Sequence, residues 1–167
     1  MKAVVVYESL WGNTAAVARA VADGIGRGAT ALSTAEAGAA ELAGADLLVA
    51  GAPVLGFKLP TDKMRESVRA NPGKAPAPPD LSHPSLRSWL AALPAGSGRC
   101  AAFDTQVRGP FGSAGPEIVA TLEKAGYRAV GKPLGFVVKG KFGPLRDGEL
   151  EHARAWGSEL AKAVEAR

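Results

Sequence analysis

The sequence predicts an α/β fold in which helices cover both faces of a parallel sheet. Short apolar runs, typical of buried strands, alternate along the chain with segments in which apolar residues recur every three or four positions, as on one face of a helix. The 167 residues are 47% hydrophobic, which suits one domain with a sizeable core. We therefore expect a single domain over residues 1–167, built from strand–helix–strand crossovers.

The first half of the chain predicts three strands and three helices. The run DLLVAG, at residues 46–51, is the clearest buried strand. The first helix ends in a glycine-rich stop, the second is weak, and the third is capped by Thr61 with Met64 and Val68 facing inward. The expected strands lie at residues 3–7, 29–32 and 46–51, and the expected helices at about residues 13–26, 35–43 and 61–70.

A proline-rich segment separates this half from the next. Residues 71–85, NPGKAPAPPDLSHPS, contain five of the twelve prolines, which exclude a helix interior or a central strand. We expect an extended surface insertion there. His83 lies beside Pro84, where we expect it to help start the next helix. A metal site at His83 is not expected, because no second His, Cys or acidic cluster is near.

The second half predicts two more strands. Helical spacing follows residue 86, and Pro116 suits the first turn of a later helix with Ile118, Val119 and Leu122 inward. Asp147 or Gly148 should cap the closing helix. The expected strands lie at residues 99–103 and 127–138, the latter broken near residues 131–133.

A polar loop, YESLWGNT at residues 7–14, joins the first strand to the first helix. Backbone N–H groups at a helix start lack partners and the helix dipole adds partial positive charge, so the loop can bind an anion. Ser9, Asn13 and Thr14 add side-chain donors, and Gly12 lets the backbone approach a ligand. The same residue types are ordinary in turns and caps, so spacing alone leaves both interpretations open.

This loop resembles the phosphate loop of flavodoxins, which bind flavin mononucleotide (FMN). The matching positions are Val5, Val6, Tyr7, Ser9, Gly12, Thr14, Ala18 and Val21. The resemblance implies FMN as cofactor, and it implies a flavodoxin-like three-layer sandwich with a five-stranded parallel sheet of order 2-1-3-4-5 and helices on both faces. The residues implied at the phosphate are Ser9, Leu10, Trp11, Gly12, Asn13 and Thr14.

The phosphate loop also departs from the flavodoxin pattern. Leu10 and Trp11 stand where flavodoxins usually carry further hydroxyl residues, and SLWG is more similar to the loop of flavodoxin-like quinone reductases. Glu8 would repel a phosphate, so we expect its side chain to point away.

The resemblance implies two further loops at the flavin ring. Residues 52–60, APVLGFKLP, offer Phe57 as a stacking residue, with ring-edge candidates Pro53, Val54, Leu55 and Gly56. Residues 104–114, DTQVRGPFGSA, offer Phe111, with further candidates Asp104, Thr105, Gln106, Gly109 and Gly112. Two alternatives stay open: the first loop can be a hydrophobic lid over the core, and the second a surface turn that caps the next helix through Ser113.

The resemblance implies an FMN-binding protein that acts in electron transfer and has no catalytic residue of its own. We expect a redox partner protein or a small quinone-like substrate. Lys58 and Arg108 outnumber the one acid, Asp104, in the ring loops. A positive charge about 8 Å from the ring would stabilise reduced flavin by roughly 2 kcal/mol, or about 90 mV, so the potential should exceed that of acidic flavodoxins.

Two other functions stay open. An FMN-dependent quinone or protoporphyrinogen reductase or oxidase is one alternative. A degenerate flavodoxin-like binding module without FMN is the other, because Leu10 and Trp11 replace hydroxyl residues.

Composition and motifs argue against further classes. Cys100 is the single cysteine, most simply a small buried hydrophobe, so no internal disulfide is expected. A receiver domain would need an aspartate at the end of the third strand, where Ala50 and Gly51 stand. The net charge of +4 is scattered and lacks the motifs of nucleic-acid readers. No leader or membrane-length apolar run is visible, so we expect a cytoplasmic monomer or weak dimer.

Overall fold

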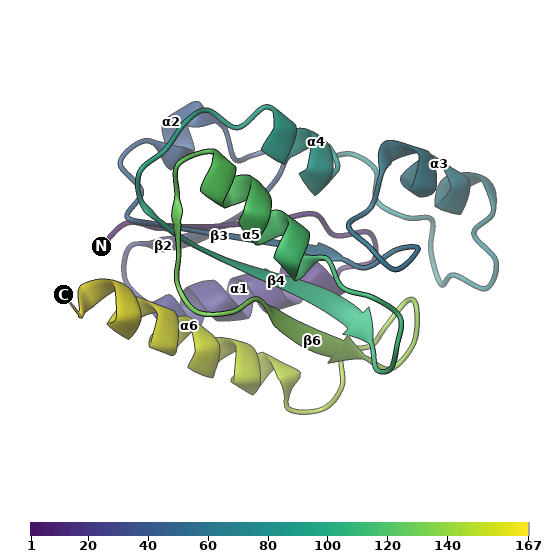
Figure 1. Cartoon of the computed structure of the whole chain (residues 1–167). Helices are drawn as coiled ribbons and strands as arrows, with labels where there is room; N and C mark the ends of the chain where they lie inside the picture. Colours follow the sequence, from purple (N-terminus) through teal and green to yellow (C-terminus); the bar gives the residue numbers. More distant parts are fainter. Residues whose placement is uncertain (167) are drawn as a thin grey trace.

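The computed structural model describes residues 1–166, which form six strands and six helices (Figure 1). The strands are β1 (Ala3–Tyr7), β2 (Ala29–Ser33), β3 (Leu47–Pro53), β4 (Arg99–Val107), β5 (Arg128–Ala129) and β6 (Leu134–Val138). The helices are α1 (Asn13–Ile25), α2 (Ala39–Leu42), α3 (Asp62–Ala70), α4 (Leu86–Ala91), α5 (Gly115–Lys124) and α6 (Glu149–Glu165).

All strands run parallel in one sheet of order β2-β1-β3-β4-β5, and β6 also pairs with β4. β5 pairs with the first residues of β4 and β6 with the last five, so the two are halves of one broken edge strand. The break includes Pro133, which has no amide hydrogen to donate. The predicted order 2-1-3-4-5 and the break near residues 131–133 are both confirmed.

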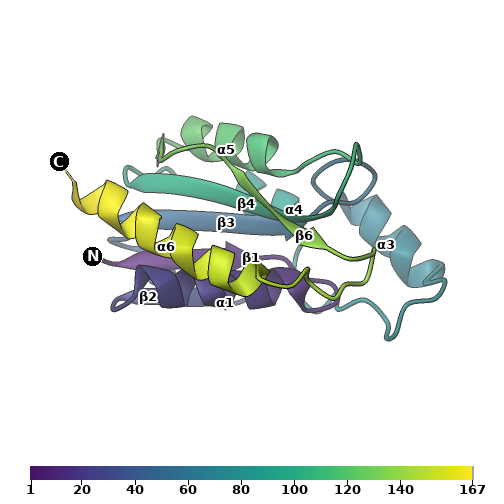
Figure 2. The ribbon, with the colours of Figure 1, turned by 90° about the horizontal axis from the view of Figure 1, so that it is seen from below.

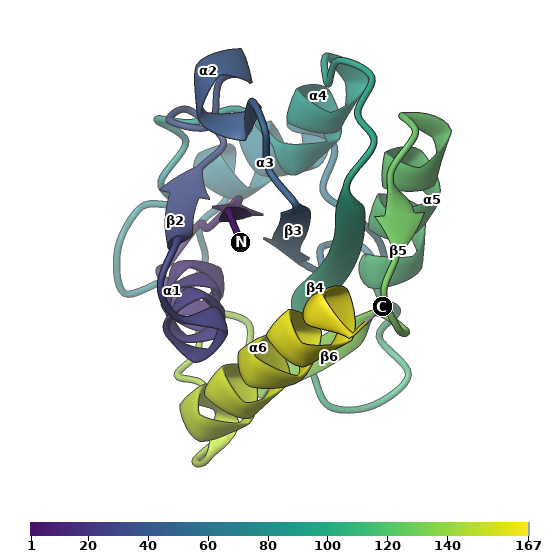
Figure 3. The ribbon, with the colours of Figure 1, turned by 90° about the vertical axis from the view of Figure 1, so that its left-hand side faces the viewer.

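Helices cover both faces of the sheet (Figures 2 and 3). Successive side chains of a strand point to opposite faces, so Val5 packs toward α1 and α6 while Val4 and Val6 pack toward α2, α4 and α5. The first layer includes Val17 and Trp156, and the second includes Leu86 and Ile118. The predicted three-layer sandwich is therefore confirmed. α3 lies past the carboxyl ends of the strands (Figure 1).

Three element limits differ from the sequence prediction. β3 continues to Pro53 and β4 to Val107, because residues 104–107 find pairing partners on β6 and residues 52–53 find them on β4. α2 is shorter than expected, because residues 33–37 form a turn in which the Glu36 carboxylate accepts from the Ser33 amide (2.9 Å). None of the helices within residues 1–166 is long and apolar enough to cross a membrane.

Candidate functional site

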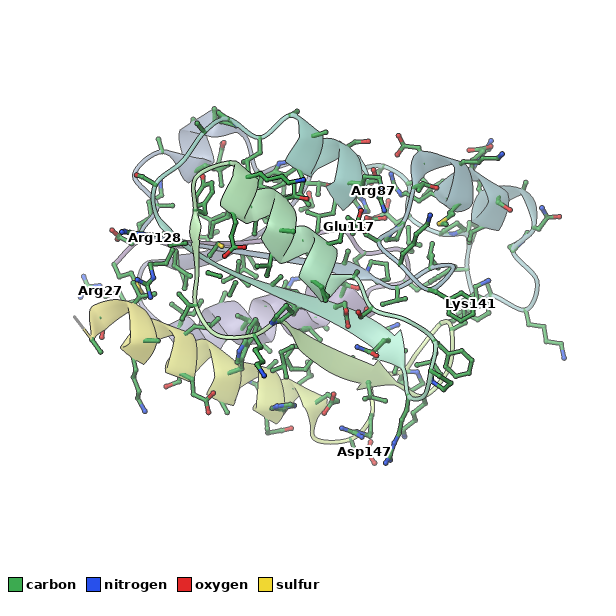
Figure 4. The ribbon with its side chains drawn as sticks, in the orientation of Figure 1. Arg27, Arg87, Glu117, Arg128, Lys141 and Asp147 are labelled. Carbon is green, nitrogen blue, oxygen red and sulfur yellow. The ribbon has the colours of Figure 1, made fainter. Side chains whose placement is uncertain are left out.

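Four loops meet where the strands end, at the carboxyl edge of the sheet. They are the Ser9 loop (residues 8–13) after β1, the Phe57 turn (residues 55–58) after β3, the Phe111 loop (residues 108–114) after β4 and the Lys141 loop (residues 139–148) after β6. Figure 4 shows Lys141 at this edge. Ligands of open α/β sheets bind at this edge, so the groups of these four loops are the candidates for holding one.

The Ser9 side chain organises the loop that bears its name. Its hydroxyl oxygen accepts hydrogen bonds from the amides of Gly12 (3.1 Å) and Ala15 (3.2 Å), which folds the loop around it. Gly12, at the N-cap of α1, has a φ of 95°, a conformation that favours glycine. With two bonds accepted, the Ser9 hydroxyl keeps its own hydrogen to donate.

Four backbone amides of this loop and the first turn of α1 have no hydrogen-bond acceptor within the described chain. Within residues 1–166, the amides of Leu10, Trp11, Asn13 and Thr14 donate no hydrogen bond. Buried or half-buried amides are normally paired, so these donors are available to a ligand. They lie at the positive end of the α1 dipole, and the loop contains no Lys or Arg. The arrangement suits an anion held by neutral dipoles.

Glu8 points away from these amides, as expected. It is fully buried, and its Oε1 accepts from the Leu86 amide (2.8 Å) while its Oε2 pairs with Nε of Arg65 (3.1 Å). Burial raises the pKa of Glu8 to about 7, although the Leu86 amide and the Arg65 guanidinium oppose the shift. The carboxyl group therefore does not compete with an anion at the loop.

The Phe57 turn projects an aromatic ring into solvent. Leu55 and Lys58 exchange backbone hydrogen bonds (3.0 and 3.1 Å) around Gly56 and Phe57, whose φ angles are 53° and 69°. Phe57 is the only residue other than glycine with a positive φ within residues 1–166, and its exposed fraction is 65%. An aromatic residue held in this conformation and left exposed is a candidate for ligand contact.

The Phe111 loop packs directly against the Phe57 turn. Gly112 has a φ of 81°, and a Cβ atom there would lie 2.0 Å from the carbonyl oxygen of Phe57. The close approach therefore requires glycine. The exposed fraction of Phe111 is 48%, so the two contacting loops present two of the three exposed large hydrophobic side chains of the described chain.

The residues just before this loop belong to a strand and stabilise the fold. Asp104, Thr105 and Gln106 belong to β4, so their expected place in a loop is wrong. Oδ2 of Asp104 accepts from the amides of Ala114 (2.8 Å) and Gly115 (3.1 Å), so Asp104 caps α5, whereas the alternative left open for this loop named Ser113 as the cap. Its pKa is raised by burial, against these two bonds and the one from Gln106.

Two adjoining hollows lie among the four loops. The narrow hollow, about 80 Å³, is lined by Ser9, Leu10, Trp11, Asn13, Thr14, Pro53, Val54, Leu55, Thr105, Val107, Val138 and Lys141. The wide hollow, about 460 Å³, is lined by Val54, Leu55, Gly56, Phe57, Met64, Ser67, Val68, Val107, Phe111 and Lys141. They share Val54, Leu55, Val107 and Lys141, so a hollow next to the free amides continues into an apolar one.

Most of the residues predicted for the site line these hollows. Thr105 lines the narrow hollow, and its hydroxyl lies 2.8 Å from that of Thr14. Five predicted residues line neither hollow, namely Gly12, Asp104, Gln106, Gly109 and Gly112.

Sequence reasoning missed two elements of the site. Met64 and Val68 are half-buried on the wall of the wide hollow, so their expected inward position in the core is wrong. In the Lys141 loop, the carbonyl of Phe142 accepts from Nδ2 of Asn13 (3.1 Å), and its ring meets Trp11 edge-on at 4.7 Å. The sequence did signal this loop, because it follows a strand that ends at the same edge of the sheet.

The loops around the wide hollow are positively charged. Residues 54–61, 107–114 and 139–144 contain Lys58, Arg108, Lys139 and Lys141 and no acid. Lys139 is paired with Asp147 (3.5 Å), whereas Lys58, Arg108 and Lys141 have no carboxylate partner within the described chain.

His83 and Cys100 are both buried. His83 is buried behind the Ser9 loop, and Ser85 caps α4, so the expected role of His83 at the helix start is wrong. Cys100 is buried in β4 as expected, and burial raises the pKa of its thiol to about 11. Among residues 1–166 no group of three His, Cys, Asp or Glu side chains could hold a metal ion.

Comparisons with known proteins give one family and a consistent set of structures. The model of the family described as Flavodoxin matches residues 5–156. A flavodoxin from the domain Archaea is 23% identical, with 99% of each chain covered and a TM-score of 0.69. The WrbA-like flavodoxin from Agrobacterium tumefaciens is 21% identical, with 98% of this chain and 97% of that chain covered and a TM-score of 0.61. No curated protein matches this sequence.

Proposed function

Because the chain belongs to the flavodoxin family, we propose that it binds FMN across the two hollows and carries electrons between redox partners. The observation that carries this proposal is the set of four amides, Leu10, Trp11, Asn13 and Thr14, that lack an acceptor within the described chain. A phosphate monoester is the ligand group that such donors at a helix start fit best. The Ser9 hydroxyl would add a fifth donor.

The order of the hollows supports FMN over a simple phosphate ion. FMN is polar at its phosphate and apolar at its ring, and the narrow hollow beside the amides leads into the apolar wide hollow. The exposed rings of Phe57 and Phe111 flank the wide hollow and can stack on a planar ring. When bound, FMN would supply the uptake and release of electrons, and the chain would bind, orient and shield it.

The charges of the site bear on the potential at which electrons are taken up. Lys58, Arg108 and Lys141 are unpaired around the wide hollow. Positive charge stabilises the negative charge that reduction adds, so these side chains would raise the reduction potential above that of acidic flavodoxins. The exposed positions of the three side chains mean that salt weakens the effect.

An absorption spectrum of the purified protein over about 300–600 nm, repeated after incubation with FMN and desalting, tests the proposal. We expect flavin bands that remain with the protein. Riboflavin, which lacks the phosphate, should bind at least about tenfold more weakly than FMN, because it leaves the four amides unpaired. If neither FMN nor riboflavin binds, the proposal is refuted, and the family member is a binding module that has lost its cofactor.

A second function is favoured by the size of the wide hollow, which extends as far as α3. Met64, Ser67 and Val68 of α3 line its far wall, and its volume of about 460 Å³ lies in the range of small-molecule sites. We propose a quinone-like substrate as the alternative to a partner protein; a WrbA-like protein is among the similar structures. FMN-loaded protein that has been reduced by two electrons with dithionite and freed of excess reagent, mixed anaerobically with a water-soluble quinone, should then deliver two electrons as the quinone takes up two protons. Slow, non-saturating oxidation would favour the electron carrier.

A further inference from the structure

The proline-rich segment, residues 71–85, is bound to the Ser9 loop at three successive residues. The Ser9 amide donates to Nε2 of His83 (3.1 Å), the Leu10 carbonyl accepts from the Asp80 amide (2.8 Å), and the Trp11 indole donates to the Ala77 carbonyl (3.2 Å). This segment was expected to be a surface insertion, and most of it is exposed. Its side facing the Ser9 loop is nevertheless part of the wall behind the proposed phosphate site.

Of these three bonds, only the one to His83 depends on a titratable side chain. His83 has an exposed fraction of 6%, and its Nε2 can accept the Ser9 amide only while that nitrogen carries no hydrogen. The hydrogen of neutral His83 is then on Nδ1, which faces Oδ1 of Asp80 at 3.8 Å. Protonated His83 would present an N–H group to the N–H group of Ser9 and lose the bond.

Charged groups surround His83 on several elements. Arg65 of α3 donates to its carbonyl oxygen (2.7 Å) and pairs with Glu8 at the end of β1, while Asp80 lies on the segment itself. Arg19 and Glu36 line the same hollow behind the loop as His83 and Asp80. Burial lowers the pKa of His83, Asp80 opposes this shift, and Arg65 adds to it, so the neutral form is favoured near neutral pH.

The Ser9 amide matters because the Ser9 hydroxyl organises the loop. That hydroxyl accepts from the amides of Gly12 and Ala15, so the position of the Ser9 backbone determines where residues 10–14 run. Holding Ser9 from behind, on the face away from the narrow hollow, leaves the amides of Leu10, Trp11, Asn13 and Thr14 without internal partners.

We propose that His83 is a positioning residue for the phosphate site: its unprotonated Nε2 holds the Ser9 amide and keeps the loop in the conformation that leaves four amides free for a phosphate monoester. This inference rests on the proposed function, because it assigns the phosphate of FMN as the ligand. It gives the affinity for FMN a dependence on pH that a loop held by backbone bonds alone would lack.

The first experiment compares His83→Leu, which removes the acceptor, with His83→Gln, whose amide oxygen can accept the Ser9 bond and does not titrate. FMN and riboflavin are titrated against each protein by quenching of flavin fluorescence. At about pH 7.5, His83→Leu should bind FMN about tenfold more weakly than the wild type, and His83→Gln should stay within about threefold. Riboflavin binding should change by less than about twofold in both variants, because riboflavin has no phosphate.

Acidification gives a second readout. A phosphate monoester has its own second pKa of about 6, which lowers FMN affinity in every variant at acidic pH. Wild-type affinity should fall more steeply than that of His83→Gln as pH decreases below the ordinary histidine pKa of 6.5, because only the wild type also protonates the acceptor, whose pKa is lowered by burial. Identical pH profiles of the wild type and His83→Gln, or FMN affinity within about twofold of the wild type in His83→Leu, would overturn the inference.

A flavin-free measurement separates this inference from the proposed function. Hydrogen exchange of the Ser9 amide, followed by NMR in protein without flavin, should be at least about tenfold faster in His83→Leu than in the wild type or His83→Gln. The wild-type Ser9 amide shift should also titrate with the His83 ring. If the wild type bound no FMN, the proposed function would fail, and unchanged Ser9 exchange would refute the role of His83 in any case.

Discussion

Replacing Phe57 by Asn should weaken FMN binding about tenfold and change the free energy of unfolding by less than about 1 kcal/mol. Phe57 is 65% exposed, so roughly a third of a ring that covers about 200 Å² is buried, worth at most about 2 kcal/mol. Its φ of 69° costs a residue of this kind about 1–2 kcal/mol, and Asn tolerates that conformation. The two contributions to stability therefore nearly cancel.

The same substitution has a different result if the Phe57 turn is a lid over the core. Removing a core aromatic costs about 3–5 kcal/mol, and the fully buried Phe136, which contacts Phe103 and Trp156 edge-on, is the matched control for that cost. Unfolding by urea of the flavin-free protein measures stability, and FMN titration by fluorescence measures affinity. Phe57→Tyr, which keeps the ring, should preserve FMN affinity.

Two results would refute this reasoning. A loss of more than about 3 kcal/mol in Phe57→Asn would make the side chain part of the core. An FMN affinity within about twofold of the wild type would remove Phe57 from the flavin site.

Three further predictions concern charged groups. Burial raises the pKa of Glu8 in the folded chain from its ordinary value of 4.5 to about 7, so the folded state binds more protons than the unfolded state between these two values. The free energy of unfolding should therefore fall by up to about 3 kcal/mol as pH rises through this range. Glu8→Gln should abolish this slope in urea unfolding measured at stepped pH. Lys141→Gln should lower the reduction potential of the FMN-loaded protein by a few tens of millivolts in a spectroelectrochemical titration, whereas Lys162→Gln, exposed on α6, should not. Asp104→Asn should cost about 1–2 kcal/mol of stability by weakening the cap of α5, with FMN affinity unchanged because Asp104 lines neither hollow.

Local sequence patterns predicted the parts of the fold that local physics determines. The alternation of apolar runs and helical spacing predicted the parallel sheet and the break near residues 131–133, because burial and backbone geometry act over a few residues at a time. The strand order came from the resemblance of the Ser9 loop to flavodoxins. The Ser9 loop was found for the same reason, since its donors and the helix that follows are adjacent in sequence. The rule that ligands bind at strand ends then located the Phe57 and Phe111 loops.

Pairing between strands determines the strand ends that the sequence did not predict. β4 continues to Val107 only because β6 supplies partners for residues 103–107, more than thirty positions later in the chain. That extension makes Asp104 a buried strand residue and turns its carboxylate toward the start of α5. A polar residue next to a glycine-containing loop gave no local sign of this cap.

A contact between residues far apart in the sequence also explains why the predicted role of His83 at the helix start is wrong. Its bond to Ser9 joins residues 74 positions apart, and nothing in the sequence around either residue indicates the other. Prolines around His83 exclude helix and strand, which suggested a segment without contacts, yet they also fix the backbone and lower the entropy lost when it packs against a neighbour. A proline-rich segment of this length next to a binding loop can therefore support that loop by hydrogen bonds, and should not be treated only as a surface insertion. In this chain, the segment places a titratable acceptor, His83, behind four free amides. If these amides bind the phosphate that we propose, protonation of His83 and binding of the ligand should be coupled.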